Sequence, residues 1–146
     1  MKLVVSALLV AVVAAACGAT GQPVATPGGF GDVVGALVLH GVAVHEQVSG
    51  DDGCPRVELH DNAMRLTVSV GDDTARRDVY LFRWRRAIDF DASVQSFFMC
   101  VTDFRSNHPG TVIEVVEQRP WRAFGADWSL PLKQAVTDAL AVSAGG

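Results

Sequence analysis

Histidine is the side chain best suited to acid–base chemistry and metal binding near neutral pH, and this chain contains four of them. They stand far apart in the sequence, at His40, His45, His60 and His108. His45 precedes a glutamate, as in zinc-binding helices, but the second histidine of that motif is absent and the surrounding residues follow a strand pattern. Because the spacing of metal ligands is missing, we expect these histidines to lie on the surface or in loops.

Carboxylates occur in two adjacent pairs, Asp51 with Asp52 and Asp72 with Asp73. The first pair lies among glycines but lacks the alternating oxygen ligands of a calcium loop. Aspartates in turns hydrogen-bond their own backbone, which is a sufficient reason for both pairs. The chain also lacks a G-x-S-x-G motif and a glycine-rich loop between a strand and a helix. The sequence therefore predicts no catalytic residue, no metal and no cofactor.

One stretch concentrates positive charge beside an aromatic ring: Arg83, Trp84, Arg85 and Arg86. Such a stretch can contact anionic headgroups, an anionic polymer or an acidic partner, and the alternative is a solvated hairpin end. Trp121 is expected in a connection between a strand and a helix, where it either seals the rim of the core or lines a shallow groove. Sealing is favoured, because a small domain needs its large aromatic side chains for burial. These five residues form the candidate binding surface.

The first 16 residues have the three parts of a secretory signal. Lys2 provides a positive start, residues 3–13 are almost wholly apolar, and three alanines at 14–16 form a cleavage zone. The apolar run is too short to span a bilayer, which needs about 20 apolar residues. We therefore expect export, with removal of residues 1–16.

Cys17 directly follows this signal, and the segment VAAACG at residues 13–18 resembles the lipobox of bacterial lipoproteins. In that family the cysteine is linked to diacylglycerol through a thioether and becomes the first residue of the mature chain. The family usually has leucine three positions before the cysteine, where this chain has Ala14. The resemblance implies lipidation of Cys17 and an anchor in the cell membrane or outer membrane, facing away from the cytoplasm. Cleavage without lipidation, which would give a secreted protein, is the alternative.

Residues 18–29 contain four glycines, two prolines and no charge. Such a composition cannot bury enough apolar surface to order itself, so we expect a tether with an extended length of about 40 Å. The chain then divides into a signal (1–16), a lipidated cysteine with its tether (17–29) and one domain (30–146). A domain of this size has room for a single core.

Export places Cys54 and Cys100 in an oxidising compartment, where two thiols tend to pair. With Cys17 lipidated, these are the two remaining cysteines, and one pairing is possible. Closing a loop of about 47 residues stabilises a fold by roughly 4 kcal/mol on the chain-entropy model. The alternative is two free buried thiols, which behave as small apolar side chains. A C-x-x-C motif is absent, so no thioredoxin-like activity is expected.

The elements that position these residues follow from hydrophobic periodicity. Alternation predicts strands over residues 42–48, 64–70, 78–84 and 111–117, and the middle two form a β-hairpin. Apolar spacing of three and four residues predicts one helix from Asp32 to Gly41, one that begins at Asp89 or Asp91 and stops at residues 107–110, and one capped by Ser129. In the second helix the expected core stripe is Val94, Phe97, Phe98 and Val101, and Phe104 continues it.

The order α-β-β-β-α-β-α predicts an α+β fold, with a mainly antiparallel four-stranded sheet, helices packed on one face and one disulfide. The net charge of −4 argues against nucleic acid as a partner, because phosphates need a cationic face. The sequence therefore favours an exported, membrane-anchored lipoprotein whose small non-catalytic domain binds a protein, polymer or other ligand at the cell envelope.

The alternative is a small envelope hydrolase whose active site is assembled from scattered residues such as His45, His60 or Asp61. A deep pocket joining a histidine to a carboxylate would favour the hydrolase. A shallow surface with exposed aromatic and arginine side chains would favour the binding domain.

Overall fold

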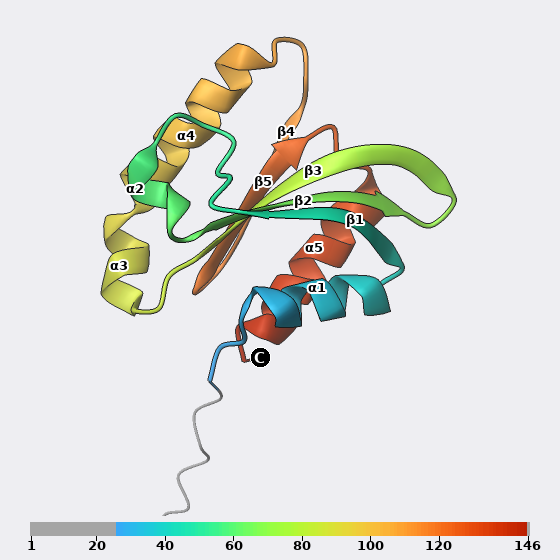
Figure 1. Ribbon diagram of the computed structural model, residues 1–146, viewed down its shortest axis with the longest axis horizontal. Helices are drawn as coiled ribbons and strands as arrows, with labels where there is room; N and C mark the ends of the chain where they lie inside the picture. Colours follow the sequence, from blue (N-terminus) through green and yellow to red (C-terminus); the bar gives the residue numbers. More distant parts are fainter. Residues whose placement is uncertain (1–25, 146) are drawn as a thin grey trace, which may run out of the picture.

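The computed structural model describes residues 26–145, which form three layers with a sheet in the middle (Figure 1). The predicted signal, Cys17 and most of the predicted tether lie outside the described residues. The helices are α1 (Phe30–Leu39), α2 (Val57–His60), α3 (Ala87–Ala92), α4 (Val94–Asn107) and α5 (Leu130–Ser143). The strands are β1 (Val42–Ser49), β2 (Ala63–Val70), β3 (Asp73–Arg83), β4 (Ile113–Gln118) and β5 (Trp121–Ala126).

The sheet has five antiparallel strands in the order β1-β2-β3-β5-β4. The α+β class, the antiparallel sheet and the β2–β3 hairpin are confirmed, whereas the prediction of four strands was wrong. The missed strand, β5, lies between β3 and β4, and its first five residues are all buried. A strand buried on both faces shows no alternation of apolar and polar residues, and Arg122 and Gly125 interrupt its apolar run. For this reason the sequence indicated a connection there.

Helices cover both faces of the sheet, so the prediction that they pack on one face was wrong (Figure 1). Helices α1 and α5 cover one face, and α4 covers the other together with the short helices α2 and α3. Strand β3 shows the reason: Val79 and Leu81 join the core under α1 and α5, while Tyr80 and Phe82 join the core under α4. Both faces of the strand are apolar, and each needs a cover. The observed order is α-β-α-β-β-α-α-β-β-α.

The apolar stripe of α5 is buried as predicted, at Leu132, Ala135, Val136, Ala139 and Leu140. In α4 the prediction was partly wrong. Phe97 and Val101 are buried there, but Val94 and Phe98 are each 42% exposed. Phe104, which continues the predicted stripe, is buried as expected, and its ring lies 5.2 Å from that of Phe124 in β5. The buried stripe of α4 is therefore narrower than the one that the sequence predicted.

The chain leaves the domain at the beginning of α1, beside the end of α5. Residues 26–29 belong to the predicted tether, yet several of them bond to the domain. The Gly28 N–H donates to the carbonyl oxygen of Ser143 at 2.8 Å, and Arg83 Nη2 donates to the carbonyl oxygen of Pro27 at 3.1 Å. The domain therefore holds this part of the chain in a defined position.

Candidate functional site

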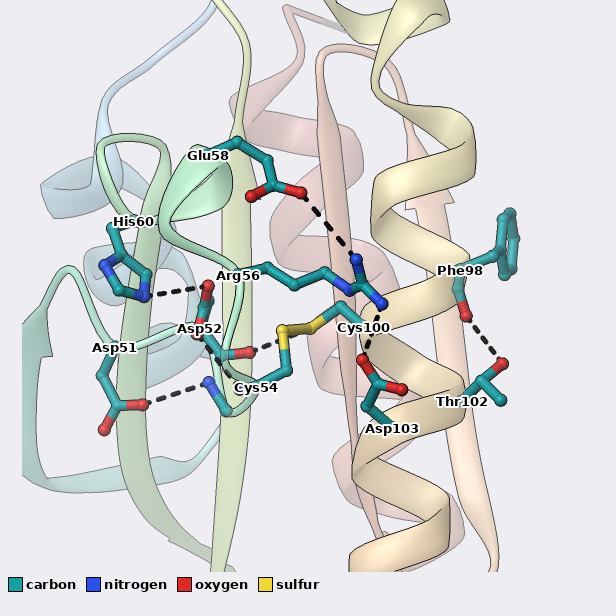
Figure 2. Close-up of a disulfide and its surroundings, with 11 residues drawn as sticks. Asp51, Asp52, Cys54, Arg56, Glu58, His60, Phe98, Cys100, Thr102 and Asp103 are labelled. Carbon is teal, nitrogen blue, oxygen red and sulfur yellow. Dashed lines mark hydrogen bonds and ion pairs between the residues drawn. A yellow bond between two sulfur atoms is a disulfide. The ribbon is translucent and has the colours of Figure 1, made fainter.

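A disulfide joins Cys54, in the loop that precedes α2, to Cys100 in α4 (Figure 2). The two Cα atoms lie 5.4 Å apart, and the cysteines are separated by 46 positions in the sequence. Cys100 is fully buried. The predicted disulfide is confirmed, and the alternative of two free thiols is wrong. The bridge fixes this loop to the helical layer over β3 and β5.

The carboxylates beside the disulfide bond to their own loop, as predicted for turn aspartates (Figure 2). Asp51 Oδ1 accepts a hydrogen bond from the Gly53 N–H, and Asp52 Oδ1 accepts one from the Cys54 N–H, both at 3.1 Å. The side chain of Asp52 is buried, and this burial raises its pKa against the lowering effect of the Cys54 N–H and of His60. Its second oxygen, Oδ2, has no hydrogen-bond partner but lies 3.3 Å from His60 Nε2. Asp52 is therefore a buried carboxylate opposed by one partly exposed imidazole.

The histidines named for a hydrolase belong to two separate pairs. His45 Nε2 lies 2.8 Å from Ser69 Oγ, between β1 and β2, while His60 faces Asp52. Asp61 is exposed directly after α2. A hydrolase of this kind needs a nucleophile, a base and an orienting group in one chain of contacts. Each pair supplies two adjacent groups of such a chain.

A charged cluster that the sequence did not predict surrounds Arg65 on the sheet. Arg65 Nε donates to Asp51 Oδ2 at 2.7 Å, and Nη1 donates to Glu46 Oε2 at 2.9 Å. Nη1 also lies 3.4 Å from Asp78 Oδ1. These hydrogen bonds raise the pKa of Arg65. Burial, followed by the charge of Asp78, raises the pKa of the nearby Tyr80 to about 12. One guanidinium thus clamps carboxylates from β1, from the loop after it and from β3.

The five residues of the predicted binding surface do not share one surface. Trp121 is fully buried and Trp84 is 4% exposed, so both rings belong to the core. The guanidinium of Arg83 lies over the ring of Trp121, at 5.7 Å from its centroid. Arg85 and Arg86 are exposed. Successive residues of a strand point to opposite faces, and this separates Arg83 from Trp84 at the end of β3.

Trp84 and Arg85 nevertheless meet at an open groove of about 410 Å³ between α2 and the beginning of α4. We call it the Trp84 groove and define it by Leu59, Asn62, Trp84, Arg85, Ser93 and Ser96. The two most buried lining residues, Leu59 and Trp84, give it an apolar floor. Its other side chains offer an amide, two hydroxyls, a guanidinium and the carboxylates of Glu58 and Asp89. A hollow of this kind suits a ligand with both apolar and polar groups.

Arg122, in β5, supports the Trp84 groove from the core. Its Nη1 donates to Ser93 Oγ at 2.9 Å and to the carbonyl oxygen of Phe90 at 3.0 Å. Its Nε donates to Glu117 Oε2 at 3.0 Å, and its guanidinium lies 3.8 Å from the centroid of the Phe90 ring. Arg122 is 2% exposed. Sequence reasoning missed it, although an arginine among the apolar residues of W-R-A-F was a signal that a buried cation needs partners.

Comparison with protein-family models, with curated proteins and with solved structures finds no match for this chain. Within residues 26–145, no three histidine, cysteine, aspartate or glutamate side chains are grouped so that they could hold a metal ion. In the same part of the chain, no helix combines the length and the apolarity needed to cross a bilayer.

Proposed function

We propose that this chain is an exported lipoprotein, anchored through Cys17 in the cell membrane or outer membrane, whose non-catalytic domain binds a protein or polymer of the cell envelope. The observation that carries the proposal is the lipobox-like segment at residues 13–18, which ends an apolar signal. The Cys54–Cys100 disulfide supports it, because structural disulfides persist in oxidising compartments outside the cytoplasm. Of the three cysteines, Cys17 is the one left for lipid.

We further propose the Trp84 groove as the site that receives the partner. It contains Trp84 and Arg85, two residues of the predicted binding surface, and it is open to solvent. Arg122 holds Ser93 and lies 5.1 Å from the centroid of the Trp84 ring. The groove is therefore built on side chains that are already locked in place, which lowers the entropy lost on binding.

A small envelope hydrolase is the second candidate. The observation that favours it is the hydrogen bond between His45 Nε2 and Ser69 Oγ, the pairing of base and hydroxyl that activates a serine. A Ser69→Ala variant distinguishes the two proposals. The hydrolase predicts loss of hydrolysis of model esters and peptides, whereas the binding protein predicts no such activity in either form.

Fatty-acid labelling of the full chain beside a Cys17→Ser variant tests the anchor, with intact-mass measurement of both. We expect label and the mass of a lipidated chain beginning at Cys17 in the wild type, and neither in the variant. An Ala14→Leu variant, which restores the usual lipobox, should be labelled at least as well as the wild type. A wild type released without lipid as free protein would overturn the anchor and leave secretion.

Envelope fractions from lipoprotein-exporting bacteria provide the binding test for the groove. A Ser96→Trp variant fills the groove, and a Ser106→Trp variant places the same side chain on an exposed position of α4 outside it. We expect retention of the wild type and Ser106→Trp on purified cell-wall polymer or envelope protein, and loss of retention for Ser96→Trp. Equal retention of the two variants would remove the groove from the proposal.

A further inference from the structure

Helix α1 lies on the outside of the domain, yet glycine or apolar residues occupy almost all of its sides. Its inner side is buried against the core: Val33, Ala36 and Leu37. Its outer side, which we call the α1 face, consists of Gly31, Gly35, Val38 and Leu39; Asp32 in the first turn and His40 directly after the helix are also exposed. Val38 is 55% exposed and Leu39 is 88% exposed. A surface helix ordinarily presents charged and polar side chains to water, and a helix that is apolar all round is ordinarily covered.

The apolar surface continues from the α1 face toward the end of α5. A groove of about 520 Å³ lies between the two helices, and Leu39 and Val142 are among its lining residues. Val142 is 64% exposed. Asp32 also lines the groove, and its Oδ2 accepts a hydrogen bond from the Gly29 N–H at 2.6 Å. Helix α1 contains no lysine or arginine.

The position of the chain indicates what covers this face. Thr26, the first described residue, also lines the groove. Cys17 stands nine residues upstream, so its lipid can lie at most about 30 Å from Thr26. We infer that the α1 face rests on the lipid bilayer that holds Cys17, an inference that depends on the proposed lipidation. The anchor keeps the face at a high effective concentration beside the bilayer, and a few apolar side chains are then enough for contact.

The chemistry of the face also selects the kind of contact. Interfacial helices that depend on anionic lipids carry lysine and arginine on their polar side, and α1 has neither. Leu39, Val38 and Val142 therefore contact the boundary between headgroups and acyl chains, and the contact does not require anionic lipid. Helices α2, α3 and α4 lie on the opposite side of the sheet (Figure 1). The Trp84 groove then faces away from the bilayer, toward an envelope partner.

Quenching of tryptophan by spin-labelled lipid tests this orientation. The lipidated full chain is placed in phosphatidylcholine vesicles with and without doxyl-labelled lipid. Leu39→Trp adds a reporter on the α1 face, and Ile88→Trp adds a matched reporter on α3, where Ile88 is 66% exposed. We expect the added emission of Leu39→Trp to be quenched roughly twofold more than that of Ile88→Trp. Replacing part of the phosphatidylcholine by phosphatidylglycerol should not increase the ratio, because α1 carries no lysine or arginine to bind anionic lipid.

A second substitution in the Leu39→Trp chain checks the groove. Val142→Asp places a charge beside the α1 face and should lower the quenching. Leu130→Asp places the same charge at the other end of α5, on a residue that is 78% exposed, and should not. Both positions are exposed, so the fold tolerates either change.

Flotation with vesicles and the intact mass separate the possible failures. If the chain carries lipid and floats but the two reporters are quenched equally, the bilayer contact is overturned and the lipoprotein proposal stands. If sedimentation shows that the lipidated chain is a dimer with the Leu39→Trp reporter shielded from lipid, a second copy covers the face, and the inference is likewise overturned. If the chain carries no lipid and does not float, the proposed function fails and this inference fails with it.

Discussion

Removal of the disulfide is the perturbation whose effect the structure specifies best. The Cys54→Ala/Cys100→Ala double variant opens a loop that spans 46 positions. On the chain-entropy model, a loop of that length contributes about 4 kcal/mol to the free energy of unfolding. A single domain has about 5–15 kcal/mol in total, so we expect the variant to lose a large part of its stability. Its melting temperature should fall by on the order of 15 °C.

Urea denaturation measures this loss. Both proteins carry Cys17→Ser, so that no third thiol can exchange with the bridge and no lipid is attached. The Cys17→Ser chain alone is the reference, and its unfolding in the presence of reductant should reproduce the behaviour of the double variant. The unfolded chain without the bridge is more expanded, so the denaturant dependence of the unfolding free energy should also become steeper.

The chain-entropy reasoning fails if the double variant loses less than about 1 kcal/mol while keeping the same secondary structure. Such a result would mean that the loop containing Cys54 is held by its other contacts. Arg56 Nη2 is the main candidate, since it donates to Asp103 Oδ2 of α4 at 2.8 Å. Adding Arg56→Ala to the double variant should then lower the free energy of unfolding by the amount that removal of the disulfide alone did not.

Three further predictions concern the buried groups. Burial raises the pKa of Asp52 above its unfolded value, 3.8, so this group makes the fold less stable as pH rises from below 3.8 through its folded pKa. Asp52→Asn should remove that slope. Urea denaturation at acidic and at neutral pH measures this, and at neutral pH the variant should be at least as stable as the wild type. A Cβ at Gly125 would lie 2.3 Å from the carbonyl oxygen of Asp78, so Gly125→Ala should cost about 3 kcal/mol by overpacking and alter the near-ultraviolet circular dichroism. Arg122→Ala should lower thermal stability by about 3 kcal/mol, and Arg122→Met should recover part of that loss because its side chain still packs on Phe90; equal losses would contradict the packing argument.

Sequence periodicity predicted the elements that are apolar on one side. The hairpin of β2 and β3 and the stripe of α5 lie where the pattern indicated. It did not predict β5, because a strand with neighbours on both edges and helices on both faces has no polar side to produce an alternation. The same omission led to the prediction of a sheet covered on one face and to Trp121 in a connection.

The candidate site likewise contains features that the sequence predicted and features that it did not. Local chemistry was sufficient for the disulfide pairing and for the backbone hydrogen bonds of Asp51 and Asp52. The Trp84 groove and the buried Arg122 join residues from separate elements, and no spacing in the chain indicates that they meet. The arginine-rich stretch was visible in the sequence. Because successive residues of a strand point to opposite faces, however, Arg83 and Trp84 lie on opposite sides of the sheet.

What the sequence by itself determined is therefore local: which two cysteines pair once a third is set aside, where single-sided helices and strands form, and which turn carboxylates bind their own backbone. These properties depend on residues close together in the chain or on a simple count. The tertiary structure alone decided the fifth strand, the second helical layer and the side chains that line the groove. Those depend on contacts between distant segments, whose free energy comes from mutual burial and leaves no periodic trace in either segment.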